Sequence, residues 1–291
     1  MFSALHRAKR TPRWRRLSAA TLVAVATVVP VGAAQGADAP LTSASAVARA
    51  DVPRPTIVLV HGAFADSSGW DDEIASLRRL GYPVVAVPDP LRSLSGDAAY
   101  VRSFLQTISG PIVLVGHSYG GAVITNAAVG LANVKALVYV GAFVPDKGQS
   151  VGSVLAEYPG SLLGPATTSV VPFADPSAPN GQNLDIYIKT QSFREVFAGD
   201  VNAATADDLA LTQRPLALTA ETEPSGDPAW KTIPSWDLIT LDDRAIPPAA
   251  QEAMAKRANA HVETVESSHA VMVSHPDAVV DIVVEAAEHA G

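Results

Sequence analysis

The 291-residue chain contains no cysteine, which excludes disulfide bonds, a cysteine nucleophile and any cysteine-ligated zinc or iron–sulfur centre. It also lacks the His-Glu-x-x-His pattern of zinc hydrolases, so we expect no catalytic metal and no cofactor. Aromatic residues make up only 6% of the chain, whereas 48% of all residues are hydrophobic. Such a chain is long enough for one large α/β domain or two small ones, and its stability must come from an apolar core.

Basic residues are scarce after the N-terminal 36 residues. The first 36 residues carry six Lys or Arg and no acidic residue, whereas the remainder carries 15 basic against 29 acidic residues, a charge near −14. A surface this acidic disfavours nucleic acids and anionic membranes as partners. We therefore expect a small molecule as the partner, and the sequence leaves the oligomeric state open.

The N-terminal segment has the form of a bacterial secretory leader. A basic stretch up to Arg16 precedes a weakly apolar run over 17–34, and small residues follow at cleavage-like positions. We predict a signal peptide over 1–36 and a secreted protein with no stable membrane association after the leader is removed; an uncleaved membrane anchor is the alternative. Residues 37–54, rich in Ala, Ser and Pro, are predicted to form a disordered linker.

One short stretch combines a strand, a tight turn and a helix. The apolar run 112–115 leads into Gly116-His117-Ser118-Tyr119-Gly120, after which apolar residues recur at helical spacing. Gly-x-Ser-x-Gly in that context is typical of a nucleophile elbow, whose glycines let a strained turn pack against its neighbours. The alternative is an ordinary turn between a strand and a helix. Ser118 is the candidate nucleophile.

Strand and helix patterns alternate along most of the folded part, residues 55–291. Alternation of this kind predicts an α/β fold, in which a mostly parallel sheet of about six strands is flanked by helices. The predicted strands are 56–60, 84–87, 112–115, 134–140, 235–241 and 261–265, and the predicted helices are 68–80, 97–107, 248–258 and 276–287. Residues 146–231 break the alternation and show only short helical patches, at 192–198 and 206–212. We interpret them as an insertion folded as a lid over the carboxyl ends of the strands.

The first predicted helix, 68–80, is amphipathic. Its apolar residues Trp70, Ile74, Leu77 and Leu80 recur at helical spacing, which predicts that all four lie on one face. Gly81 follows at the position where a glycine commonly ends a helix.

An elbow serine needs a general base and an acid that orients it, and in this architecture they follow in the order Ser, acid, His. His269 follows the last predicted strand by a short loop, while Asp242 and Asp243 directly follow the strand before it. We favour Asp243, because the loop after it should turn over the active edge. Asp242 is the alternative, and Asp146 a more distant one.

The oxyanion formed in acyl transfer needs two backbone N–H donors. One is expected from Tyr119, the residue after the nucleophile, and the other from the loop after the first strand, His61-Gly62-Ala63-Phe64. Gly62 permits a close approach, so we favour the Ala63 amide over that of Phe64. His61 is interpreted as a packing residue rather than as a base.

Five segments together resemble the α/β-hydrolase fold. Within it the chain is similar to the plant methylesterases, the hydroxynitrile lyases and their bacterial esterase relatives. The resemblance covers roughly residues 56–290 and implies Asp243 as the acid, because the acid of that family immediately precedes a Lys/Arg-x-Ile-Pro-like stretch. The segments are Val-Leu-Val-His-Gly-Ala-Phe, Gly-His-Ser-Tyr-Gly-Gly, Gly-Ala-Phe-Val-Pro-Asp, Asp-Asp-Arg-Ala-Ile-Pro-Pro and Ser-Ser-His-Ala-Val-Met.

Two departures from the lyases imply ester hydrolysis. The lyases carry a threonine after the strand-end histidine and a lysine after the catalytic histidine, where this chain has Gly62 and Ala270. Without a cation at position 270, a leaving cyanide has no partner. We expect a secreted serine esterase acting on a small-molecule ester, with Phe64 and Phe143 in a largely apolar pocket. A lactonase, an amidase, a carbon–carbon lyase and a non-catalytic binding protein are the alternatives.

Overall fold

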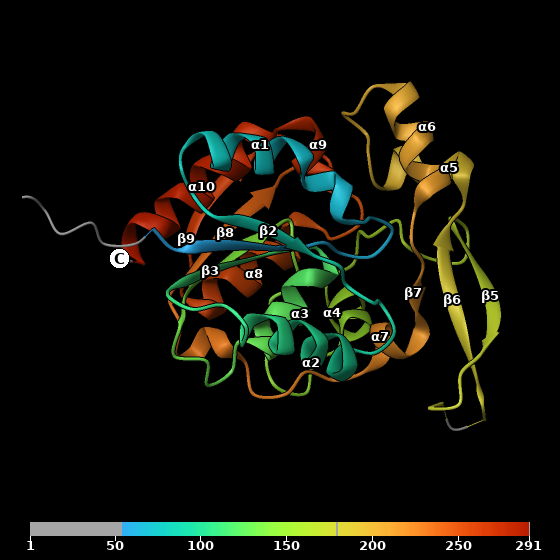
Figure 1. The fold of residues 1–291 in the computed structure, drawn as a ribbon. Coiled ribbons are helices and arrows are strands. Elements are labelled where there is room, and N and C mark those ends of the chain that lie inside the picture. Colours follow the sequence, from blue (N-terminus) through green and yellow to red (C-terminus); the bar gives the residue numbers. More distant parts are fainter. Residues whose placement is uncertain (1–53, 179, 291) are drawn as a thin grey trace, which may run out of the picture. The chain divides into compact units, whose positions relative to one another are not determined.

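The computed structural model describes residues 54–178 and 180–290, so the predicted leader and all of the predicted linker except Arg54 lie outside the described residues. A six-stranded sheet with the order β2-β1-β3-β4-β8-β9 forms its centre (Figure 1). Every strand pairs in parallel with its neighbours, which confirms the predicted sheet. Its strands are β1 (Thr56–Val60), β2 (Val84–Val87), β3 (Ile112–His117), β4 (Val134–Val140), β8 (Ser235–Thr240) and β9 (His261–Val265).

Helices cover both faces of this sheet (Figure 1). Because successive side chains of a strand point to opposite faces, Ile57 and Leu59 of β1 join one apolar core, and Val58 and Val60 join the other. The first core is covered by α1 and α10, and the second by α2, α3 and α8. The helices are α1 (Asp71–Arg79), α2 (Leu94–Leu105), α3 (Tyr119–Ala127), α8 (Pro248–Ala258), α9 (Val271–Ser274) and α10 (Pro276–His289). None of the helices in the described residues is both long enough and apolar enough to cross a bilayer.

The first helix departs from its predicted face. A 3-10 turn, η1 (Ser67–Trp70), precedes α1, and the Asp66 carboxylate caps it by accepting from the Ser68 amide. Trp70 and Leu77 are buried, but Leu80 is 48% exposed, so the prediction that all four apolar residues share one face was wrong for Leu80. A 3-10 turn advances each residue by a larger angle than an α-helix, and α1 ends at Arg79, before Leu80.

The insertion, residues 146–231, leaves the central sheet after β4 and returns to it at β8, and Figure 1 shows it beside the carboxyl ends of the strands. It contains a separate antiparallel sheet in the order β5-β6-β7, which the sequence analysis missed. Most residues of β5 are exposed, so the strand lacks the apolar alternation by which buried strands are recognised. Its elements are α4 (Val151–Glu157), β5 (Thr168–Ala174), β6 (Gln182–Ile188), α5 (Thr190–Val196), α6 (Ala203–Thr212), β7 (Leu216–Ala217), α7 (Leu218–Thr222) and η2 (Ala229–Lys231).

Backbone hydrogen bonds join the insertion to the loops that follow four strands of the central sheet. Each bond connects one insertion residue to the loop after β1, β2, β8 or β9. The pairs are Phe64 N to Arg214 O (2.9 Å), Ala217 N to Leu91 O (3.0 Å), Leu162 N to Arg244 O (2.7 Å) and Ala270 N to Phe197 O (2.9 Å). Three of these loops hold candidate site residues: Ala63 and Phe64 follow β1, Asp243 follows β8, and His269 follows β9. The insertion is therefore hydrogen-bonded to the loops that carry the site.

The two tryptophans near the end of the insertion have structural positions. The Trp230 indole Nε1 donates to the Pro145 carbonyl at 3.0 Å, which closes the two ends of the insertion. Trp236 packs in the core under α10, where its Nε1 donates to Glu285 Oε1 at 3.1 Å. Neither side chain lines the cavity at Ser118.

Candidate active site

Ser118 stands at the junction of β3 and α3 in a strained conformation. Its φ of 54° and ψ of −124° lie in a region that residues with side chains rarely adopt. The backbone around it fixes this turn: the Ser118 carbonyl accepts from the amides of Gly121 at 3.0 Å and Phe143 at 3.1 Å. The serine side chain is thereby held at the carboxyl ends of the strands.

Three glycines around the turn are required by close backbone approach. A Cβ on Gly116 would lie 2.6 Å from the Gly120 carbonyl oxygen, and one on Gly120 would lie 2.6 Å from the Val60 oxygen. A Cβ on Gly62, in the neighbouring loop, would lie 2.6 Å from the Ser118 Cβ. Side chains at these positions would force the strand, the helix and the loop apart.

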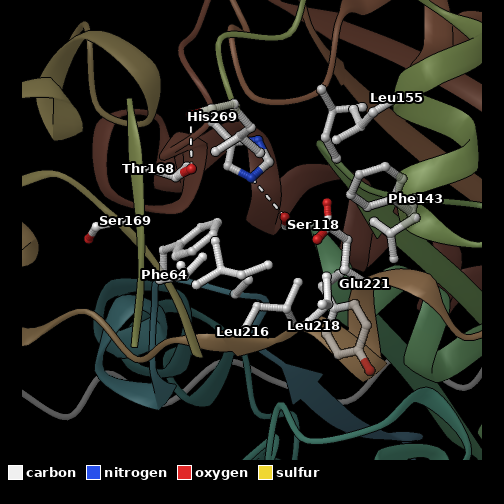
Figure 2. Close-up of a pocket in the computed structure, with 18 of the residues that line it drawn as sticks. Phe64, Ser118, Phe143, Leu155, Thr168, Ser169, Leu216, Leu218, Glu221 and His269 are labelled. Atoms are coloured by element: carbon white, nitrogen blue, oxygen red, sulfur yellow. Dashed lines mark hydrogen bonds between the residues drawn. The ribbon is translucent and has the colours of Figure 1, made fainter. Parts of the chain in front are cut away.

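Three side chains from distant parts of the chain meet at this turn. The Ser118 hydroxyl donates to His269 Nε2 at 2.8 Å, and His269 Nδ1 donates to Asp243 Oδ2 at 2.7 Å; Figure 2 shows the first of these contacts. All three residues are at most 5% exposed. The arrangement is one in which the imidazole can take a proton from the serine while the carboxylate holds its tautomer.

Asp243 is held by four further donors. Its Oδ1 accepts from the amides of Ala245 and Ile246, both at 2.8 Å, and its Oδ2 accepts from Thr240 Oγ1 at 2.8 Å and from Gln251 Nε2 at 3.0 Å. Thr240 and Gln251 were not predicted as part of the site, because a polar residue in a strand or helix gives no local sign of what it contacts. This many hydrogen bonds fix the carboxylate in one orientation.

The other two candidate acids lie elsewhere. Asp242 is exposed. Asp146 pairs with Lys231 at 2.6 Å, and this hydrogen-bonded ion pair lowers the pKa of Asp146 below its ordinary value. Neither carboxylate hydrogen-bonds to His269, whose Nδ1 partner is Asp243.

Two neighbouring histidines are buried and neutral. His61 accepts from the Asp89 amide at 2.9 Å through Nε2, and burial lowers its pKa to about 4, as suits a packing residue. His117 donates from Nε2 to the His269 carbonyl at 2.9 Å, and its ring centroid lies 4.7 Å from that of His269. Burial lowers the pKa of His117 well below its ordinary value. His117 thus contacts both the backbone and the ring of His269. Its sequence context did not reveal this contact.

Two backbone amides beside Ser118 are free to bind an oxyanion. Neither the Ala63 amide nor the Tyr119 amide has a hydrogen-bond acceptor among the described residues. The Phe64 amide donates to the Arg214 carbonyl at 2.9 Å and is therefore occupied. The Tyr119 hydroxyl donates to Asp97 Oδ2 at 2.9 Å, which fixes this residue.

A cavity of about 530 Å³ opens over Ser118 and His269 (Figure 2). The predicted pocket residues Phe64 and Phe143 both line it, and most of the other lining side chains are apolar. Residues from the sheet edge include Ala63, Tyr119 and Ile246, and residues from the insertion include Val151, Leu155, Leu163, Ile186, Leu216, Leu218 and Glu221. Over 54–178 and 180–290, no group of three or more His, Asp or Glu residues is arranged to hold a metal ion.

Comparisons with known proteins agree with this architecture. The family model described as "Alpha/beta hydrolase family" matches residues 57–282. The alpha/beta hydrolase nvfD of Aspergillus novofumigatus is 29% identical over 258 residues, which cover 81% of this chain and 98% of that protein. A carbendazim hydrolyzing esterase of Nocardioides sp. is 35% identical over 111 residues, which cover 34% of this chain and 46% of that protein.

A solved structure shares the fold. Polyneuridine aldehyde esterase superposes with a TM-score of 0.68 at 17% sequence identity, over 80% of this chain and 98% of that chain. The sheet order, the elbow and the match of the family model to residues 57–282 all point to the same family. The chain belongs to the α/β-hydrolase family.

Proposed function

We propose that this protein is a secreted serine hydrolase that cleaves a carboxylic ester through an acyl-enzyme. The observation that carries the proposal is the pair of contacts at His269, 2.8 Å to the Ser118 hydroxyl and 2.7 Å to the Asp243 carboxylate, at the base of an apolar cavity. The esterase among its relatives agrees with this reaction.

The residues of the site act in turn in the proposed reaction. His269 takes the hydroxyl proton as Ser118 Oγ attacks the ester carbonyl, and the oxyanion that forms accepts from the amides of Ala63 and Tyr119. One such donor lowers the free-energy barrier by on the order of 3 kcal/mol. The carbon–oxygen bond then breaks and the alcohol leaves with the proton from His269. A water molecule, deprotonated by His269, attacks the acyl-enzyme and releases the acid.

The surroundings of His269 favour an ester over a cyanohydrin. A carbon–carbon lyase that releases cyanide needs a cation near the base, but the next residue, Ala270, is buried and has no charge. No Lys or Arg is among the described residues that line the cavity. A binding protein without activity would have no use for the strained Ser118 and the four donors at Asp243.

Hydrolysis of 4-nitrophenyl esters of increasing acyl length tests this function. We expect the mature protein to release nitrophenol, and the Ser118→Ala variant to lose this turnover while its circular dichroism is unchanged. The dependence of turnover on acyl length would also show how long an acyl chain the cavity accepts. Equal turnover by both proteins would refute the serine mechanism, and no turnover on any ester would refute the esterase.

Export is a separate part of the proposal. It rests on the basic and weakly apolar residues 1–36, which lie outside the described residues. N-terminal sequencing of the protein recovered from the medium of a bacterial host should show cleavage near position 36, and deletion of 1–36 should leave activity intact. Retention of the full chain in the membrane fraction would favour an anchor instead.

A further inference from the structure

The wall that the insertion contributes to the cavity carries one charged side chain, Glu221 of α7. Figure 2 shows its carboxylate directed into the cavity on the side of Ser118. No hydrogen bond or salt bridge to this carboxylate occurs in the described part of the chain. By contrast, Glu223, two residues further on, accepts from the Ser95 amide at 3.1 Å.

The surroundings of Glu221 are apolar. Its neighbours in the cavity wall include Leu155, Leu216 and Leu218, and partial burial raises the pKa of Glu221 above its ordinary value. A carboxylate that loses part of its hydration and gains neither a cation nor a hydrogen bond is destabilised. A ligand that supplies a positive charge would compensate for this loss.

Among the described residues no Lys or Arg lines the cavity, and two cationic side chains outside it are already paired. Arg92 pairs with Asp185 at 2.6 Å, and Lys231 pairs with Asp146 at 2.6 Å. The cavity wall also presents the aromatic rings of Phe64 and Phe143, which attract alkylated cations as well as apolar groups. The acidic chain, near −14 after residue 36, would favour the approach of such cations.

We propose that this cavity selects esters that carry an organic cation, such as a quaternary ammonium group, and that Glu221 pairs with that cation; the proposal rests on the esterase function above. The aromatic and leucine side chains then contact the alkyl groups of the cation. Glu221 is a specificity residue in this proposal and takes no part in bond cleavage.

Two pairs of esters that differ only in charge test the proposal. Choline butanoate is compared with 3,3-dimethylbutyl butanoate, and methyl 4-(trimethylammonio)butanoate with methyl 5,5-dimethylhexanoate, so that the cation is placed once in the alcohol and once in the acyl group. Acid release gives kcat/KM for the wild type, for Glu221→Gln and for the matched control Glu223→Gln.

In at least one pair we expect the wild type to favour the cationic ester. Glu221→Gln should reduce the ratio of cationic to neutral turnover at least about tenfold, which corresponds to about 1.4 kcal/mol. Glu223→Gln should leave the ratio unchanged, because its carboxylate does not line the cavity. An equal ratio in the wild type and Glu221→Gln, with both turning over the neutral esters, would overturn this inference and leave the esterase intact.

Binding decides the question even if no ester is hydrolysed. Choline butanoate is titrated by calorimetry into the Ser118→Ala variant and into the double variant Ser118→Ala/Glu221→Gln. Binding that weakens about tenfold or more on loss of the carboxylate supports the inference. Equal affinity, or no binding to either protein, overturns it.

Discussion

The two walls of the cavity are built in opposite ways. On the sheet-edge wall, the polar side chains are fixed by several partners: His269 bonds to both Ser118 and Asp243, and Asp243, which does not itself line the cavity, accepts five hydrogen bonds. On the insertion wall, apolar side chains predominate, and the carboxylate of Glu221 has no partner among the described residues. Hydrogen bonds therefore fix the polar groups of the first wall, whereas the second wall, as far as the structure describes the chain, offers an apolar surface with one unpaired charge.

This difference fits the function that we propose for each wall. Proton transfer and attack on a carbonyl tolerate displacements of the reacting atoms of well under 1 Å. The groups that perform these steps must therefore be fixed before the substrate arrives. Recognition of an apolar or cationic group needs only a complementary surface. Changes on the sheet-edge wall should therefore lower kcat, and changes on the insertion wall should mainly alter KM and the choice of substrate.

The largest expected effect is that of Ser118→Ala. Loss of the proposed nucleophile should lower kcat by about 10⁶-fold while the melting temperature stays within a few degrees. The matched control is Ser169→Ala, which removes the same hydroxyl from the insertion wall of the cavity and should retain nearly full activity. Comparable losses in the two variants would contradict the division between the walls.

The next largest effect is expected at the acid. Asp243→Asn should lower kcat by about 10⁴-fold, because an amide stabilises the wrong tautomer of His269. Asp242→Asn makes the same change on the exposed neighbour and should alter kcat less than about twofold. Steady-state kinetics of both variants decides which aspartate acts, and a severe loss in Asp242→Asn alone would reverse the assignment.

Adding one methyl group to a backbone glycine should have different effects on the two walls. In Gly62→Ala the new Cβ would lie 2.6 Å from the Ser118 Cβ and 2.7 Å from the His117 carbonyl oxygen. The displaced loop should lower kcat by about 10²-fold. Gly164→Ala adds the same methyl to the insertion wall, where no atom lies within 4 Å of it, so its kcat should remain that of the wild type. A neutral Gly62→Ala would show that the loop can move freely.

The smallest expected effect is that of Leu155→Ala on the insertion wall. Removing part of the apolar surface should raise KM for a medium-length acyl ester about fivefold, which corresponds to about 1 kcal/mol, with kcat nearly unchanged. Leu211→Ala, in an insertion leucine that is 74% exposed, is the control and should change neither constant. If Leu155→Ala lowered kcat instead, the insertion wall would be part of the positioning machinery.

Local sequence patterns were sufficient for the central sheet and for the elbow. Strands such as β3 are buried on both faces, so they appear as continuous apolar runs, and the glycines of the elbow are needed by contacts within a few residues. The same reasoning placed Ser118, Asp243 and His269 at the ends of their strands, and the structure brings them into contact.

What the sequence did not reveal depends on contacts between distant residues. The bond from the Phe64 amide to Arg214 spans 150 positions, and Gln251 reaches Asp243 only because α8 packs beside β8. β5 is exposed on both faces and pairs with β6 alone, so no apolar period marks it. Leu80 is the C-cap residue that follows α1, and it is exposed, which the spacing of the apolar residues alone did not indicate.

The four backbone bonds between the insertion and the loops after β1, β2, β8 and β9 have a consequence for heat resistance. Insertions with exposed strands such as β5 open more readily than a sheet buried on both faces. When the insertion loosens, the Phe64 loop and the loops beside Asp243 and His269 lose an anchor at the same time. Activity should therefore disappear on warming before the central sheet melts, so that the temperature limit of the enzyme is set by its insertion rather than by its core.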